Sequence, residues 1–144
     1  MKLPRTPSLR LDGRRALVTG ASSGIGFGCA AAVAEAGAHV VCVARREGPL
    51  QEAVATLTEA GYSAEALVLD MADLAATAAA IQSQPAFDAV VNAAGMARHG
   101  PAFETDPGDY QAVMDLNVPG AYYLRLQCAK AMPAQGVKGS INQD

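Results

Sequence analysis

Glycine and serine crowd one short stretch of this chain, TGASSGIG at residues 19–26. Gly20, Gly24 and Gly26 recur as Gly-x-x-x-Gly-x-Gly, a spacing that permits a tight turn and a close approach of a ligand to the backbone. Where such a turn leads into a helix, unpaired N–H groups and the positive end of the helix dipole can hold a phosphate, and Ser22 and Ser23 would add hydroxyl donors. The Gly-Lys-Ser/Thr ending of a P-loop is absent. The alternatives are therefore another kind of phosphate site and a tight turn that holds no ligand.

Apolar runs and helix-type segments alternate along the chain around this loop. Hydrophobic periodicity predicts strands at 16–19, 39–44, 64–69 and 87–92, and helices at 25–36, 48–60, 73–83 and 107–131. The buried face of the first helix is predicted to carry Ile25, Cys29, Val33 and Ala36. Asp73 is the expected N-cap of the third helix. The Gly-Ser-Ile run at 139–141 can begin a fifth strand.

Strands that alternate with helices and are apolar on both faces predict a parallel sheet covered on both sides. Right-handed crossovers then give an α/β fold, doubly wound and Rossmann-like. Ligands of such sheets bind beyond the carboxyl ends of the strands, so the segments to examine are 19–26, 44–46, 70–71 and 92–95. We expect residues 1–144 to form a single, partial dinucleotide-binding domain in which residues 1–13 are an N-terminal arm.

Composition narrows the class of protein. With 144 residues, 51% of them hydrophobic, and a net charge of −3, the chain can bury a core and lacks the basic surplus of a nucleic-acid-binding protein. No apolar run approaches membrane-spanning length, so we expect no membrane partner. The three cysteines have no metal-ligand spacing, which predicts no metal site and favours a reducing, cytoplasmic location.

Four motifs in order resemble the short-chain dehydrogenase/reductase family: TGASSGIG (19–26), LDMAD (69–73), NAAG (92–95) and DLNVPGAYYL (115–124). The resemblance covers nearly the whole chain from about Leu11. It implies an oxidoreductase that interconverts an alcohol and a carbonyl in a small-molecule substrate with NAD or NADP. The cofactor-binding residues that it implies are Gly20, Ser22, Ser23, Gly24, Ile25, Gly26, Arg45, Arg46, Asp70, Met71, Asn92, Ala93, Ala94 and Gly95.

The resemblance also implies individual roles. The glycine loop would carry the pyrophosphate and its ribose. Asp70 would accept a hydrogen bond from the adenine amino group, with Met71 contributing its backbone; the alternative for Asp70 is an N-cap or a surface carboxylate. Asn92 keeps the first Asn of the family's Asn-Asn-Ala-Gly segment, whereas Ala93 replaces the second.

The residues after the second strand favour NADP over NAD. NAD sites place a carboxylate there to bind the adenosine ribose, whereas here Arg45 and Arg46 come first and Glu47 follows. A guanidinium pairs strongly with a phosphate, so Arg45 suits the 2′-phosphate of NADP. The alternative is that both arginines are solvated loop residues.

Asn117 matches the family's catalytic Asn. It lies on an apolar stripe with Val113, Ala121, Leu124 and Cys128, at spacings of three and four, which predicts a buried side chain with hydrogen-bond partners. Pro119 would kink this helix by freeing the carbonyl of residue 115. The alternative is a core asparagine without a catalytic role.

The family's catalytic Ser, Tyr and Lys cannot be placed. Each of the four tyrosines lacks a lysine four residues later, and Ser140 precedes the fifth strand. We therefore expect a sheet truncated after the long fourth helix, an open edge on strand four, and a chain inactive alone. An open edge and an uncovered long helix favour a homo-oligomer. The alternatives are a nucleotide-binding half-Rossmann module without turnover and a non-functional fragment.

Overall fold

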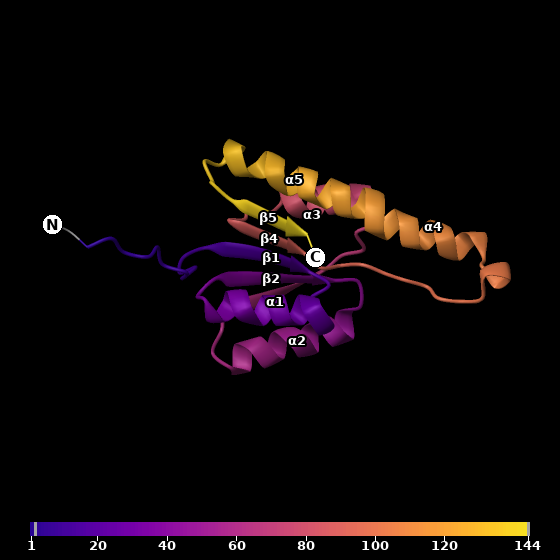
Figure 1. The fold of residues 1–144 in the computed structure, drawn as a ribbon, viewed down its shortest axis with the longest axis horizontal. Helices are drawn as coiled ribbons and strands as arrows, with labels where there is room; N and C mark the ends of the chain where they lie inside the picture. Colours follow the sequence, from indigo (N-terminus) through magenta and orange to yellow (C-terminus); the bar gives the residue numbers. More distant parts are fainter. Residues whose placement is uncertain (2, 144) are drawn as a thin grey trace.

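Five parallel strands form one sheet in the computed structural model, which describes residue 1 and residues 3–143. The strands are β1 Arg15–Thr19, β2 His39–Ala44, β3 Ala64–Val68, β4 Ala89–Asn92 and β5 Ser140–Gln143. They lie side by side in the order β3-β2-β1-β4-β5 (Figure 1). The chain winds outward from β1 to β3 and then crosses back to β4, so its direction of winding switches between β1 and β4. The predicted α/β, doubly wound parallel sheet is confirmed.

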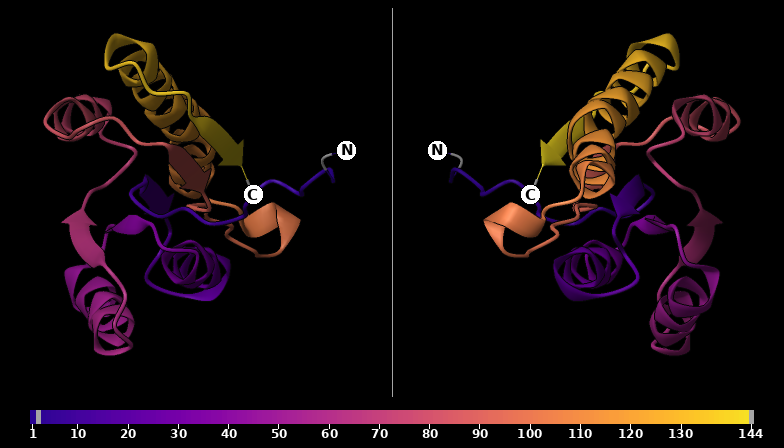
Figure 2. Two further views of the ribbon diagram at one scale, coloured as in Figure 1. Left: turned by 90° about the vertical axis from the view of Figure 1, so that its left-hand side faces the viewer. Right: turned by 90° about the vertical axis from the view of Figure 1, so that its right-hand side faces the viewer.

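Helices cover both faces of the sheet. They are α1 Gly24–Glu35, α2 Glu47–Glu59, α3 Leu74–Gln82, α4 Pro107–Asp115 and α5 Ala121–Ala134, with a 3₁₀ turn η1 at Ala102–Glu104 and a π-turn η2 at Leu116–Gly120. α1 and α2 lie on one side of the sheet, α3 and α5 on the other (Figures 1 and 2). No helix in the described part of the chain is long and apolar enough to cross a membrane.

Alternate side chains of the central strands enter two separate cores. Leu17 of β1 packs with Val41, Val90 and Leu124 on the side of α3 and α5. Its neighbours Ala16 and Val18 pack on the side of α1 and α2. Successive residues of a strand point to opposite faces, so a strand that is covered on both sides must be apolar throughout. This requirement explains why the sequence of β1 and β2 shows little polar alternation.

The buried face of α1 differs from the predicted one. Ile25 is 66% exposed, whereas Gly26, Ala30 and Ala34 are buried. Small side chains on this face let the helix axis approach β1 and β2 closely, and Ile25 remains at the helix start beside the end of the sheet. Of the predicted face of Ile25, Cys29, Val33 and Ala36, Cys29 and Val33 are partly buried and pack against the core, whereas the prediction is wrong at Ile25.

The sheet continues after the long helix with a paired fifth strand. Residues 140–143 of β5 pair in register with residues 89–92 of β4, over the full length of β4. The prediction of an open edge on strand four is wrong, and β5 forms that edge of the sheet in the described residues. The predicted long helix is present as α4, η2 and α5, which follow one another without a break and end three residues later than expected, at Ala134. Its N-cap is Asp106, whose side chain accepts a hydrogen bond from the Gly108 amide.

Candidate functional site

The glycine loop packs directly against the turn that follows β4. Gly20 has a φ of +66°, and a Cβ at this position would lie 2.6 Å from the carbonyl oxygen of Ala93. A Cβ on Gly26 would lie 2.2 Å from the carbonyl oxygen of Gly20. Only glycine fits at both positions. Gly20 is required by its positive φ and by the lack of space for a Cβ, and Gly26 by the lack of space alone. The loop is therefore held as a tight turn at the point where the winding of the chain switches direction.

The N-terminus of α1 has no side-chain cap. Ser23 occupies the N-cap position in an extended conformation, but its side chain makes no capping hydrogen bond. In contrast, the side chain of Asp73 accepts from the Ala76 amide at the start of α3. Because the first-turn N–H groups of a twelve-residue helix are left without a side-chain acceptor, they are available to an anion.

A cavity of about 600 Å³ lies over the carboxyl ends of the strands. Twelve of the predicted site residues line it: Gly20, Ser22, Ser23, Ile25, Gly26, Arg45, Arg46, Asp70, Met71, Ala93, Ala94 and Gly95. Segments that are far apart in the sequence meet there because parallel strands end at the same edge of the sheet. The structure thus brings the motifs of three βα turns and of the turn after β4 to one place.

Asn92 is predicted as a site residue but is fully buried beneath the cavity rather than part of its wall. Its Oδ1 accepts a hydrogen bond from the Thr19 hydroxyl at 2.5 Å, and the Thr19 oxygen in turn accepts from the Ala94 amide at 3.0 Å. Its Nδ2 donates to the side chain of Gln143 at 3.4 Å. Asn92 therefore joins β1, β4 and β5, and shapes the wall through Ala94. Gly24, with a φ of +56°, is also outside the lining residues.

Asn117 is exposed, so the prediction that its side chain is buried is wrong. Its Oδ1 accepts from the Met96 amide at 3.0 Å and its Nδ2 donates to the Met96 carbonyl at 2.8 Å. Both ends of the carboxamide are thus bound by one residue of the loop after β4. Asn117 lies within the π-turn η2, where Pro119 interrupts the regular helix as expected from the sequence.

The charged residues at the cavity are unevenly paired. Arg45 and Arg46 are exposed and form no ion pair or side-chain hydrogen bond with any described residue. One carboxylate oxygen of Asp70 accepts from the Ala72 amide at 3.0 Å, which shapes the turn after β3. Two guanidinium groups are therefore available to an anionic ligand at one side of the cavity.

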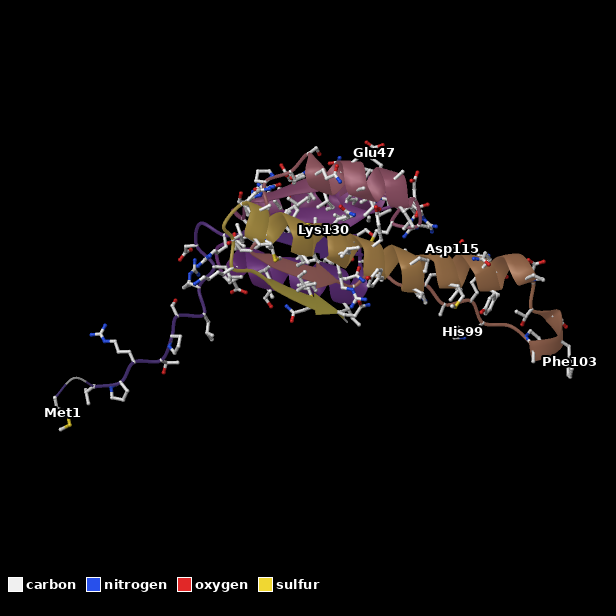
Figure 3. The ribbon with its side chains drawn as sticks, turned by 90° about the horizontal axis from the view of Figure 1, so that it is seen from above. Met1, Glu47, His99, Phe103, Asp115 and Lys130 are labelled. Carbon is white, nitrogen blue, oxygen red and sulfur yellow. The ribbon has the colours of Figure 1, made fainter. Side chains whose placement is uncertain are left out.

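Sequence reasoning missed the part of the cavity wall that α4 and the start of η2 contribute. Ala112, Asp115 and Leu116 line the cavity, and their spacing of three and four places them on one face of α4 and η2. Arg98 also lines it and forms an ion pair with Asp109 of α4, which ties the loop to the helix. Figure 3 shows Asp115 on this helix and Phe103 in η1, beyond the start of the helix and well away from the sheet. The helical spacing was the available signal.

Residues 14–142 match the family model of the short chain dehydrogenases. The chain belongs to this family. The resemblance of its four motifs is thereby confirmed.

Curated relatives of the chain are dehydrogenases and reductases. It is 38% identical over 136 residues to a galactitol 2-dehydrogenase (L-tagatose-forming) of Cereibacter sphaeroides, covering 92% of this chain and 53% of the relative. It is 36% identical over 135 residues to a D-erythrulose reductase of Gallus gallus, covering 94% and 53%. The chain thus spans about half the length of the curated relatives it matches.

Solved structures share the fold. A gluconate 5-dehydrogenase from Burkholderia cenocepacia, in complex with NADP and tartrate, is 36% identical with a TM-score of 0.84, over 94% of this chain and 55% of that one. A short-chain type dehydrogenase/reductase from Mycobacterium marinum is 31% identical with a TM-score of 0.88, over 94% and 57%.

Proposed function

We propose that this chain is the NADP(H)-binding part of an oxidoreductase that interconverts an alcohol and a carbonyl. One observation carries the proposal: the uncapped N-terminus of α1, its glycine loop and two unpaired arginines face the same cavity. The chemistry of this donor set fits a dinucleotide, because backbone N–H groups suit a pyrophosphate and guanidinium groups suit a further phosphate. When bound, the nicotinamide ring supplies or accepts the hydride.

Each cofactor group has a matching element in this proposal. The N–H groups at the start of α1, with Ser22 and Ser23, would hold the pyrophosphate. Asp70, whose turn lines the cavity, would accept from the adenine amino group. Gly95 leaves room beside the turn after β4, where a Cβ would meet only the Asn117 Oδ1, at 3.6 Å.

NADP is proposed over NAD because of Arg45 and Arg46. A carboxylate at this position would repel a 2′-phosphate, whereas Arg45 is able to bind one. The NADP complex of the Burkholderia cenocepacia gluconate 5-dehydrogenase supports the assignment by similarity.

The proposed substrate is a small polyhydroxylated alcohol or ketone. Support comes from relatives named for galactitol, D-erythrulose and L-xylulose. None of the four tyrosines is followed four residues later by lysine, so the Ser, Tyr and Lys of the family remain unplaced in this chain. Asn117 is proposed to correspond to the family's catalytic Asn, and in this chain both ends of its carboxamide hold the backbone of Met96.

A calorimetric titration of the 144-residue chain with NADPH, repeated with NADH, tests the proposal. We expect NADPH to bind at least about tenfold more tightly than NADH, since a paired phosphate contributes about 1.4 kcal/mol or more. Equal affinities would contradict the assignment of Arg45. Failure to bind either dinucleotide would contradict the proposed function itself.

A second candidate is a nucleotide-binding module without turnover. The absence of a Tyr-x-x-x-Lys pattern from the chain favours it. An assay of NADPH oxidation with D-erythrulose tests the module, because a module binds NADPH without consuming it and any turnover would contradict this candidate. In either case we propose one partial dinucleotide-binding domain with residues 1–13 as an arm.

We further propose that the chain forms homo-oligomers through its long helix. Tyr110, Val118 and Tyr122 on α4, η2 and α5 are between 52% and 61% exposed, which leaves apolar area open to a second copy. Light scattering over a concentration series tests this, and a monomer at every concentration would contradict it.

A cytoplasmic location is proposed from the cysteines. Cys29, Cys42 and Cys128 are free, and burial raises the pKa of the Cys42 thiol to about 11 and that of Cys128 to about 12. Free thiols are typical of a reducing compartment. Fractionation of cells that express the protein tests the location, which recovery outside the cytoplasm would contradict.

A further inference from the structure

Gly120 ends the π-turn η2 and is buried against the turn that follows β3. A Cβ at this position would lie 2.8 Å from the Met71 carbonyl oxygen and 2.9 Å from the Asp115 carbonyl oxygen. The φ of −60° and ψ of −50° at Gly120 are ordinary helical values that any residue adopts. Space, rather than conformation, therefore requires glycine here.

The two segments that meet at Gly120 both belong to the candidate site. Asp70, Met71 and Ala72 form the turn after β3 and line the cavity. On the other side, η2 carries Leu116, which lines the cavity, and Asn117, which holds Met96. Met71 is only 3% exposed, so its backbone has little freedom to move away.

The contact at Gly120 is between backbone and backbone, which makes it stiff. A flexible side chain yields when a neighbour grows, but a carbonyl in a tight turn does not. The turn after β3 is further held by the Ala72 amide on Asp70 and by the Asp73 amide on the Asp70 carbonyl, both at 3.0 Å. A group added at Gly120 would therefore displace η2 rather than the turn.

We infer that Gly120 is a positioning residue that seats η2 against Met71 and thereby sets the carboxamide of Asn117 against Met96. The turn proposed to contact adenine and the loop held by Asn117 are coupled through this contact. The inference rests on the proposed function in taking these two segments as parts of one cofactor site, while the coupling itself is a property of the chain without ligand.

Hydrogen exchange of the Met96 amide, followed by NMR on the 144-residue chain without ligand, measures this coupling. The test variant is Gly120→Ala, and the matched control is Gly28→Ala in α1, where a Cβ would meet nothing within 4 Å. We expect Gly120→Ala to speed exchange at Met96 by about fivefold or more, since one weakened hydrogen bond has roughly that effect. Exchange in β1 and β2 should stay unchanged, and Gly28→Ala should leave Met96 at the parent rate.

A double-mutant cycle with Asn117→Ala separates positioning from general destabilisation. If Gly120 acts through Asn117, the double variant exchanges at Met96 no faster than Asn117→Ala alone. Additive effects, or an unchanged rate in Gly120→Ala, would overturn the inference.

Two further measurements keep the inference testable. If Gly120→Ala does not fold, the exchange rate of the Ala72 amide is measured in the Asn117→Ala variant instead, because coupling is reciprocal. An unchanged exchange rate at Ala72 would overturn the inference. A parent chain that binds no NADPH would contradict the proposed function but would leave the ligand-free exchange result standing.

Discussion

The two ends of the parallel sheet satisfy their polar groups in different ways. At the amino end, polar groups of the chain bind one another: the Asp88 carboxylate accepts from the Arg15 backbone amide at 2.8 Å and from the Arg14 guanidinium at 3.1 Å. At the carboxyl end, the first turn of α1 has no side-chain cap, and the side chains of Arg45 and Arg46 have no partner among the described residues. One end is organised for stability, while the other leaves donors and positive charge available to a ligand.

Further polar side chains at the amino end are also bound to partners within the chain. The guanidinium of Arg15 lies 5.3 Å from the centre of the Phe87 ring and donates to Gln84 at 2.8 Å. His39 Nδ1 and the Ser63 hydroxyl are 2.6 Å apart. Apart from the Arg15 Nε, which is buried without a hydrogen-bond partner among the described residues, these groups use their hydrogen-bonding capacity within the chain and gain little from a ligand. The comparison therefore predicts that substitutions at the amino end change stability, and that those at the carboxyl end change binding.

The largest expected effect is at Gly20, where a substitution should change both stability and NADPH binding. Gly20→Ala should lose about 3 kcal/mol of unfolding free energy, because a positive φ costs about 1 kcal/mol and the contact with Ala93 adds about 2. NADPH binding should be lost as the turn is displaced. Gly61→Ala is the control, since Gly61 also has a positive φ, of +88°, but open space for a Cβ. Urea unfolding and calorimetry measure both, and equal losses in the two variants would contradict the role of the Ala93 contact.

Asp88→Ala should affect stability alone. It leaves the Arg15 amide at the start of β1 without its acceptor, which costs about 2 kcal/mol for a partly buried group. Asp88→Asn keeps one acceptor oxygen and should recover most of that loss. NADPH affinity should stay at the parent value in both variants. A weakened affinity in Asp88→Ala at a temperature where the variant is folded would show that the two ends are not independent.

Arg45→Asp should have the opposite pattern. The side chain is exposed and unpaired, so the unfolding free energy should change by less than about 0.5 kcal/mol. NADPH affinity should fall by about tenfold or more, because a charge-assisted contact is replaced by repulsion. Arg5→Asp in the N-terminal arm changes the net charge equally and serves as the control. If both variants bind NADPH as the parent does, the arginine has no role in cofactor choice.

Motif order and strand ends were sufficient to predict the fold and most of the cavity wall. Parallel strands bring the residues after each strand to one edge, so Gly20, Arg45, Asp70 and Ala94 could be placed together from the sequence. The Asp73 cap was equally local, since it depends on residues only three apart. These features follow from local motifs and from the general geometry of a parallel sheet.

Features that depend on how closely two elements approach were not predictable. In α1, Gly26 and Ala30 face the sheet instead of Ile25, because close packing of a helix on a sheet favours small side chains over large ones. The apolar stripe likewise predicted a buried Asn117, but the π-turn η2 directs its side chain toward Met96. Spacing alone carries no information on the distance between helix and sheet, and a π-turn changes the phase of the helix that spacing assumes.

Ser23→Asp tests the same comparison between the two ends of the sheet and has the smallest expected effect. An aspartate at the empty N-cap should stabilise the chain by about 0.5–1 kcal/mol, as Asp73 and Asp106 do for their own helices. The same carboxylate would occupy the N–H groups proposed for the pyrophosphate and repel its charge, so NADPH affinity should fall. Ser23→Asn supplies a cap without charge and should stabilise the helix with a smaller loss of affinity. Higher stability together with unchanged NADPH affinity in Ser23→Asp would mean that the start of α1 does not hold the phosphate.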